Sequence, residues 1–113
     1  MNFSHHDLTL FDRSYPLVST TSGITIQSGL SEIVTFKIED AYDIPGNLSM
    51  ISFSSNTGVF RDNDFGWGGS NNNRLLLIDT FNCPGTGQIV VEIIVENLRF
   101  ARGYSYFPVT ITP

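Results

Sequence analysis

The stretch QIVVEIIVE, residues 88–96, decides the fold class of this sequence. Every second side chain in it is apolar, namely Ile89, Val91, Ile93 and Val95. The side chains between them are mixed, namely Val90, Glu92, Ile94 and Glu96. Because successive side chains of a strand point to opposite faces, this pattern predicts a strand with one face in a core and the other half in water. Such strands are typical of antiparallel sheets.

Other runs with the same period lie on both sides of this stretch. Val34, Phe36 and Ile38 share one face of residues 32–38, and Phe107, Val109 and Ile111 share one face of residues 104–112. Shorter strands are expected at residues 8–11, 15–20, 24–26, 48–54 and 75–78. Pro108 predicts that the last strand lies at a sheet edge or ends there, since proline has no N–H for a sheet hydrogen bond. The sequence has no apolar stripe of helical period over three turns, so it predicts an all-β antiparallel sandwich of seven to nine short strands.

Length and composition limit the classes of protein that remain. The 113 residues predict a single domain over 1–113, with a flexible arm at 1–7. A net charge of −5 with one lysine argues against a nucleic-acid partner, and no apolar run is long enough to be inserted in a membrane. Cys83 is the only cysteine, so it has no intrachain partner, and residues 1–7 do not resemble a signal peptide. The location stays open between the cell interior and an extracellular or virion surface, there as part of a longer protein or assembly.

Four segments follow one another in an order that resembles the bacterial Ig-like domains of invasin and intimin-type surface proteins. They are VTFKIEDAY with IPG (34–42 and 44–46), MISFSSNTGVF (50–60), DTFN before GQIVVEI (79–82 and 87–93), and FPVTI (107–111). The resemblance covers roughly residues 24–112. It implies an Ig-like β-sandwich that acts as a stalk spacer or presents an adhesive surface, and that is not an enzyme. The chain departs from the family pattern at Asp43 and in the longer turn at residues 83–86.

The segment NTGVFRDNDFGWGGSNNN, residues 56–73, is expected to be a long loop with little regular structure. One interpretation is structural, with Phe65 and Trp67 forming a small core under the loop. A second is a carbohydrate site, because an aromatic face and neighbouring Asn and Asp side chains suit a sugar ring and its hydroxyls. Its residues would be Trp67, Phe65, Asp62, Asp64, Asn71 and Asn72. A third is a calcium site formed by Asp62, Asp64 and Asp79, the only cofactor that the sequence suggests.

Three functions therefore stay open. The first is a structural or adhesive module of a larger surface or particle assembly, which contacts a protein partner or its own copies through edge strands and residues 56–73. The second is a small lectin-like domain, and the third is a viral or phage fibre or decoration domain. Tyr104 and Tyr106 form an aromatic strip on the last strand, although such pairs are usually half-buried rim residues. No set of catalytic residues is recognised, so we expect no enzymatic activity.

Overall fold

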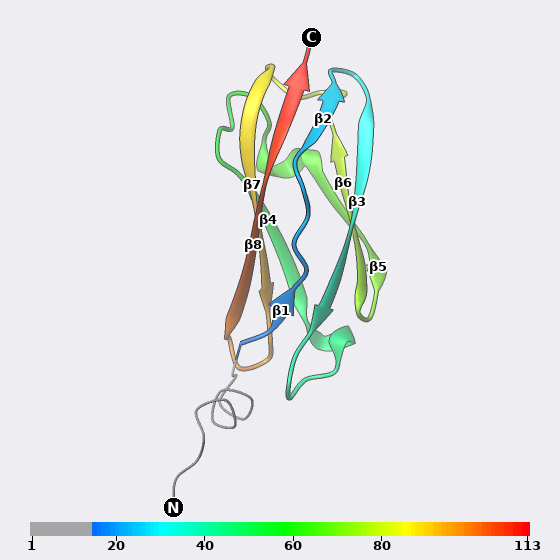
Figure 1. Cartoon of the computed structure of the whole chain (residues 1–113), viewed down its shortest axis with the longest axis vertical. Coiled ribbons are helices and arrows are strands. Elements are labelled where there is room, and N and C mark those ends of the chain that lie inside the picture. The colour runs from blue at the N-terminus through cyan, green and yellow to red at the C-terminus, as the bar shows by residue number, and fades with distance from the viewer. Residues whose placement is uncertain (1–14) are drawn as a thin grey trace, which may run out of the picture.

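A computed structural model describes residues 15–113 as eight strands in two four-stranded sheets (Figure 1). The first sheet has the order β1-β3-β6-β5 and the second the order β2-β8-β7-β4. The predicted strand at 8–11 and the arm at 1–7 lie outside the described residues. The strand bounds are β1 Leu17–Val18, β2 Ile24–Gln27, β3 Ser31–Glu39, β4 Ser49–Ser54, β5 Phe65–Ser70, β6 Asn73–Asp79, β7 Gly87–Glu96 and β8 Arg102–Thr112.

The remaining regular elements are two single turns of 3₁₀-helix, η1 Pro45–Asn47 and η2 Asp62–Asp64. Among residues 15–113, no helix has the length and apolarity that crossing a membrane requires. All strand pairs are antiparallel except β2 and β8, which run parallel. The prediction of antiparallel sheets therefore holds for every pair but one.

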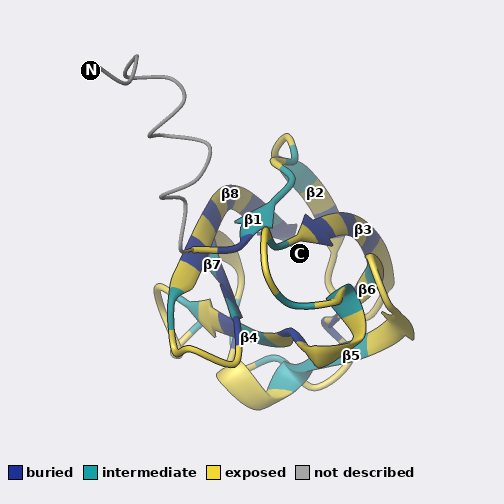
Figure 2. Cartoon of the chain, turned by 90° about the horizontal axis from the view of Figure 1, so that it is seen from below, coloured by how far each residue is buried: buried dark blue, intermediate teal, exposed yellow. Residues whose placement is uncertain are grey.

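The core lies between the two sheets and is built from the strand faces that alternation predicted (Figure 2). Every second residue of β7 from Ile89 to Val95 is buried, and Phe36 on β3 contacts Phe107 on β8 with ring centroids 6.0 Å apart. Each such side chain contributes about 2 kcal/mol by leaving water. The two-residue period thus fixes which face of each strand turns inward.

Pro108 lies in a strand at the middle of its sheet, so the prediction of an edge strand was wrong. Val90 is its partner on β7, and the N–H and C=O of Val90 both bond to Ser55, at 2.8 and 3.0 Å, on the side away from β8. Pro108 therefore needs no N–H toward β7. On its other side β2 begins only at Ile24, opposite Val109, so the missing N–H points where no strand of residues 15–113 pairs.

Residues 56–73 contain a strand, so the expected loop was wrong for residues 65–70 and for residue 73. β5 pairs with β6 through a tight turn in which Asn71 has a φ of 54°. Asparagine accepts this left-handed conformation more readily than most residues. Three of the six residues of β5 are glycine, which weakens the strand signal in the sequence.

The turn between β7 and β8 holds an unusual residue at its tip. Phe100 has a φ of 65° and is 81% exposed. The turn is held by the buried Asn97, whose side-chain oxygen accepts hydrogen bonds from the N–H groups of Arg99 and Ala101 at 2.9 and 3.0 Å. Asn97 also donates to Asp40 across 3.1 Å, which joins this turn to residues 40–43. A bulky residue thus occupies a backbone position that favours glycine or asparagine.

Candidate functional site

The aromatic residues of the predicted carbohydrate site face the interior of the sandwich. Trp67 lies opposite Leu76 and contacts Phe36, with ring centroids 6.1 Å apart. Phe65 contacts the buried Phe60 at 4.7 Å, and both predicted rings are half-buried against the core. These contacts correspond to the structural interpretation of Phe65 and Trp67. The difference is that the two rings pack against the main core and do not form a separate small core under a loop. Binding of sugar by these residues stays a prediction.

The polar residues of that predicted site hold the backbone. Asp62 accepts a hydrogen bond from the N–H of Ser54 at 2.8 Å. Asp64 accepts from the Arg61 guanidinium, at 3.0 and 3.1 Å, and from its N–H at 3.0 Å. These bonds to Arg61 lower the pKa of Asp64 although burial opposes the shift. Both carboxylates therefore have structural partners that a ligand would have to replace.

Asn71 and Asn72 form the β5–β6 turn. The Asn71 carbonyl accepts from Arg74 at 2.8 Å, and the Asn72 carbonyl accepts from the N–H of Ile38 at 3.0 Å. The two asparagines thus connect this turn to its surroundings through their main chain. Neither asparagine lines the depression described next.

Asp64 and Asp79, two of the three predicted calcium ligands, border one shallow depression of about 240 Å³. Asn63 and Asn82 border it as well, whereas Asp62 does not. Within residues 15–113, no three His, Cys, Asp or Glu side chains are grouped closely enough to hold a metal ion. The structure thus brings two of the three carboxylates together. Calcium binding stays a prediction.

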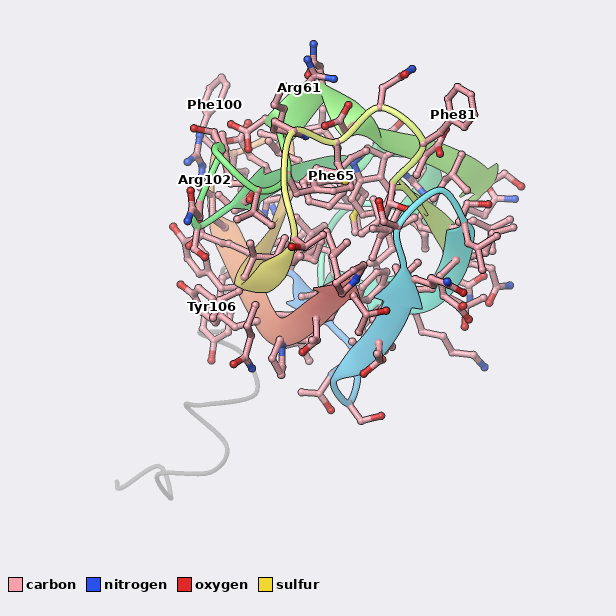
Figure 3. The ribbon with its side chains drawn as sticks, turned by 90° about the horizontal axis from the view of Figure 1, so that it is seen from above. Arg61, Phe65, Phe81, Phe100, Arg102 and Tyr106 are labelled. Atoms are coloured by element: carbon pink, nitrogen blue, oxygen red, sulfur yellow. The ribbon has the colours of Figure 1, made fainter. Side chains whose placement is uncertain are left out.

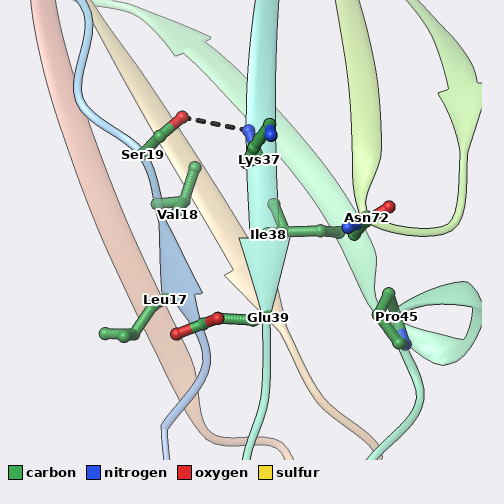
Figure 4. A pocket seen from close by; sticks show the side chains of 8 residues that line it. All are labelled: Leu17, Val18, Ser19, Lys37, Ile38, Glu39, Pro45 and Asn72. Atoms are coloured by element: carbon green, nitrogen blue, oxygen red, sulfur yellow. Dashed lines mark hydrogen bonds between the residues drawn. The ribbon is translucent and has the colours of Figure 1, made fainter.

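A larger hollow of about 430 Å³ lies where the two-residue strand β1 leaves the side of β3 open (Figure 4). Ser19 accepts a hydrogen bond from the N–H of Lys37 at 3.0 Å across this hollow. The hollow is lined by Leu17, Val18, Ser19, Lys37, Ile38, Glu39, Pro45 and Asn72. One ammonium and one carboxylate on an open apolar surface do not make a nucleophile with its base.

The outer surface of the second sheet carries a group of exposed aromatic and aliphatic side chains. Tyr104 and Tyr106 on β8 are 51% and 57% exposed, and Phe53 on the edge strand β4 is exposed as well. Ile94 lies among them and is only 4% exposed, although its side chain points outward. We call this surface the aromatic face. It comprises Ile51 and Phe53 on β4, Val90, Glu92, Ile94 and Glu96 on β7, and Arg102, Tyr104 and Tyr106 on β8.

Three charged groups interrupt the aromatic face in fixed places. Glu92 lies between Phe53 and Tyr106, and a hydrogen bond to its carboxylate raises the pKa of Tyr106. At the end of the face, Arg102 donates to Glu96 across 2.8 Å. Figure 3 shows Arg102 and Tyr106 on the outside of the molecule, and Phe65 between the sheets. The face therefore combines apolar surface with an ordered row of polar groups.

Of the aromatic face, only the two tyrosines were predicted from the sequence as a possible surface feature. Tyr104 and Tyr106 form a strip that is visible in the sequence, and alternation places Val90, Glu92 and Ile94 on one strand face. Phe53 joins them only because β4 pairs with β7, in the register that sets Phe53 beside Glu92. The tyrosines are also more exposed than rim residues usually are, and they lie on a central strand.

No protein-family model and no curated protein sequence matches the chain. Titin domain M7 has a similar structure, with a TM-score of 0.64 at 14% identity over 88% of this chain and 96% of that chain. A titin M10–obscurin-like 1 Ig mutant complex matches with a TM-score of 0.60 at 12% identity, over 87% and 94% of the two chains. The sialic acid binding region of a Streptococcus sanguinis SK1 adhesin, bound to 3'sLn, matches with 0.63 at 11%, over 90% of this chain and 31% of that chain.

These similarities show an Ig-like fold. The predicted fold class, an all-β Ig-like sandwich of seven to nine strands, is confirmed with eight strands in residues 15–113. The resemblance to invasin and intimin-type modules is confirmed at the level of the Ig-like fold. The bacterial type itself stays a prediction.

Proposed function

We propose that this chain is a non-enzymatic structural module that binds another protein domain through its aromatic face. The observation that carries the proposal is the cluster of Phe53, Val90, Tyr104 and Tyr106, all exposed around the covered Ile94. Single exposed apolar residues are ordinary, but a contiguous group on one face is typical of a contact surface. Tyrosine is enriched at such surfaces because it offers a large rigid ring and one polar atom.

The aromatic face is also rigid before any partner arrives. Its tyrosines project from β8, a central strand that pairs with β7 along ten residues, from Gly87 opposite Ile111 to Glu96 opposite Arg102. A partner would therefore order few main-chain groups, so less of the free energy of contact is lost to conformational entropy. This favours a binding role over a surface that is apolar by chance.

The similar structures are compatible with this role. One of them is a complex between titin M10 and an Ig domain of obscurin-like 1, so two domains of this fold can bind each other. The resemblance of residues 24–112 to invasin and intimin-type modules implies the same class of role, in a surface or particle assembly. The proposed location is therefore an extracellular or particle surface. A viral or phage fibre or decoration domain is one kind of protein that has this role there.

Site-specific photo-crosslinking in the producing cells tests this function. A photoreactive phenylalanine analogue at Tyr104 or at Tyr106 should form a protein adduct. The same analogue at Phe81, an exposed ring beyond the end of β6, is the matched control and should form none. Equal adduct formation at Phe81 and Tyr104 would contradict a binding role for the aromatic face.

A neutral glycan is the second candidate ligand, at the depression between η2 and the end of β6. Asn63, Asp79 and Asn82 line this depression beside Asp64 and offer the donors and acceptors that sugar hydroxyls need. Asp79 would repel an acidic sugar, and Arg61 is already paired with Asp64, so the glycan expected here carries no charge. A neutral-glycan array tests it. Binding that survives Asn82→Ala and Asp79→Asn together would contradict a site in this depression.

A further inference from the structure

We infer that the aromatic face takes a second copy of this chain, packed about a two-fold axis that runs along the strands between β7 and β8. This inference rests on the proposed function and names its partner. It is carried by the order of side chains across the two strands. When two copies pack about an axis along the strands, opposite groups meet, whereas about an axis across the strands they do not.

The outward side chains of β7 and β8 form five rows across the strands. From one end to the other, the pairs are Glu96 with Arg102, Ile94 with Tyr104, Glu92 with Tyr106, Val90 with Pro108, and Gln88 with Thr110. In the two rows with an acidic residue, that residue is on β7 and its partner on β8 is a guanidinium or a hydroxyl. The acceptors therefore follow one strand and the donors follow the other.

A two-fold axis along the strands places β7 of one copy over β8 of the other and keeps each row opposite itself. Arg102 then faces Glu96 of the second copy, and the Tyr106 hydroxyl faces Glu92 of the second copy. Tyr104 packs on Ile94 of the second copy, where apolar surface meets apolar surface. Each row with an acidic residue thus meets groups of opposite character, and it does so twice because the contact is symmetric.

The other symmetric packing, with the axis across the strands, is disfavoured by charge. It would place β7 over β7 and reverse the rows. If the axis crosses the row of Ile94, Glu96 faces Glu92 of the second copy, and if it crosses the row of Glu92, that carboxylate faces its own counterpart, so like charges repel in both cases. If the axis passes between these two rows, Glu96 faces Val90 and Glu92 faces Ile94 of the second copy, so both carboxylates lose water without gaining a partner. The positions of these two carboxylates therefore select the axis along the strands.

The size of the face sets the strength of the contact. Eight residues of strand span about 26 Å and the three strands of the aromatic face span about 14 Å, so each copy offers roughly 370 Å². The total of roughly 700 Å² is in the range of weak, transient contacts, so the dimer is expected to be weak. Measurements therefore have to extend to about 1 mM, the concentration at which an association of roughly −4 kcal/mol is observed.

Two charge reversals and their mixture test the register by sedimentation equilibrium. Arg102→Glu sets two pairs of carboxylates against each other in its own dimer, and Glu96→Arg sets two pairs of guanidinium groups against each other. Each variant alone should dimerise about tenfold more weakly than the unmodified chain. In the mixture, each altered side chain faces an opposite charge, so the two variants should form a heterodimer. Lys37→Glu, on the outer face of the other sheet, is the matched control and should dimerise normally.

The outcomes separate the inference from the proposed function. A heterodimer in the mixture, together with weak association of each variant alone, supports the two-fold register. Association of both single variants at the level of the unmodified chain would overturn it, and so would an unmodified chain that stays monomeric at 1 mM. If the chain stays monomeric but the analogue at Tyr104 still crosslinks to a different protein, the proposed function stands without this partner. Circular dichroism should show that all variants are folded, because Arg102 and Lys37 are exposed and Glu96 is partly exposed on the outer face of its strand.

Discussion

Replacing Phe100 should reverse the usual order of alanine and glycine stability. At most positions alanine is the more stable of the two, because glycine loses more conformational freedom on folding, by about 0.7 kcal/mol. Residue 100 has a φ of 65°, a left-handed conformation that costs a residue with a Cβ roughly 1.5 kcal/mol. Alanine keeps this strain and glycine releases it. Phe100→Gly should therefore be more stable than Phe100→Ala by about 0.8 kcal/mol.

Urea unfolding followed by circular dichroism measures this difference. Both variants lose the same ring, so the ring contacts cancel in the comparison. The difference of about 0.8 kcal/mol corresponds to a midpoint of thermal unfolding about 3 °C higher for the glycine variant. Leu98 is the matched control, because it is exposed in the same turn and its φ is not positive. Leu98→Ala should be the more stable of its pair. Equal or greater stability of Phe100→Ala relative to Phe100→Gly would refute the reasoning from backbone strain.

Three further changes have defined expectations. Among the described residues the buried Ser105 hydroxyl has no hydrogen-bond partner, so Ser105→Ala should raise the free energy of unfolding by about 1 kcal/mol, and a loss of that size would contradict this. Arg74 donates to three carbonyls in the η1 region and the β5–β6 turn, so Arg74→Leu should lower it by about 2 kcal/mol in urea titrations; an unchanged value would mean that water replaces these bonds. Burial alone would raise the pKa of Asp40, but hydrogen bonds from the Asp43 N–H, Asn97 and the Tyr42 N–H lower it below 3.8. The stabilisation by the Asp40 carboxylate is therefore complete above pH 3.8 and is lost as the pH falls through the lowered pKa of the folded state. Asp40→Asn should thus lower the free energy of unfolding more at pH 6 than at pH 3. An equal loss at both pH values would contradict a role for the charge.

Strands with one buried face were predictable because burial imposes a period on the residues themselves. Residues 32–38 and 88–96 show it, and both lie within the strands β3 and β7. β5 was not predictable in this way, since Gly66, Gly68 and Gly69 have no side chains to alternate. It is a strand because β6 offers a hydrogen-bonding edge, which is a property of tertiary structure. The place of Pro108 in a central strand was not predictable either, because a proline fits there only if β2 begins to pair after it, at Val109.

The candidate site was predictable only in part for a related reason. The composition of residues 56–73 is unusual, and from the sequence it is typical of a small core under a loop, of a carbohydrate site or of a calcium site. In the structure, its Asp and Asn residues hold turns, and Phe65 and Trp67 extend the core. The aromatic face depends on which strands are neighbours, and a single sequence does not specify the neighbours of a strand. Its two tyrosines are visible in the sequence, whereas the order of rows that they form with β7 is not.

The position of Trp67 gives the protein an internal spectroscopic reporter. It is the only tryptophan, and its ring rests on Phe36. It lies on β5, which within residues 15–113 pairs with β6 alone and forms the edge of its sheet. Edge strands can open at a lower free energy than the whole domain unfolds. Detachment of β5 would expose the indole to water and shift its fluorescence to longer wavelength while the other strands stay paired. Emission from this ring therefore reports local opening of one strand separately from loss of the sandwich.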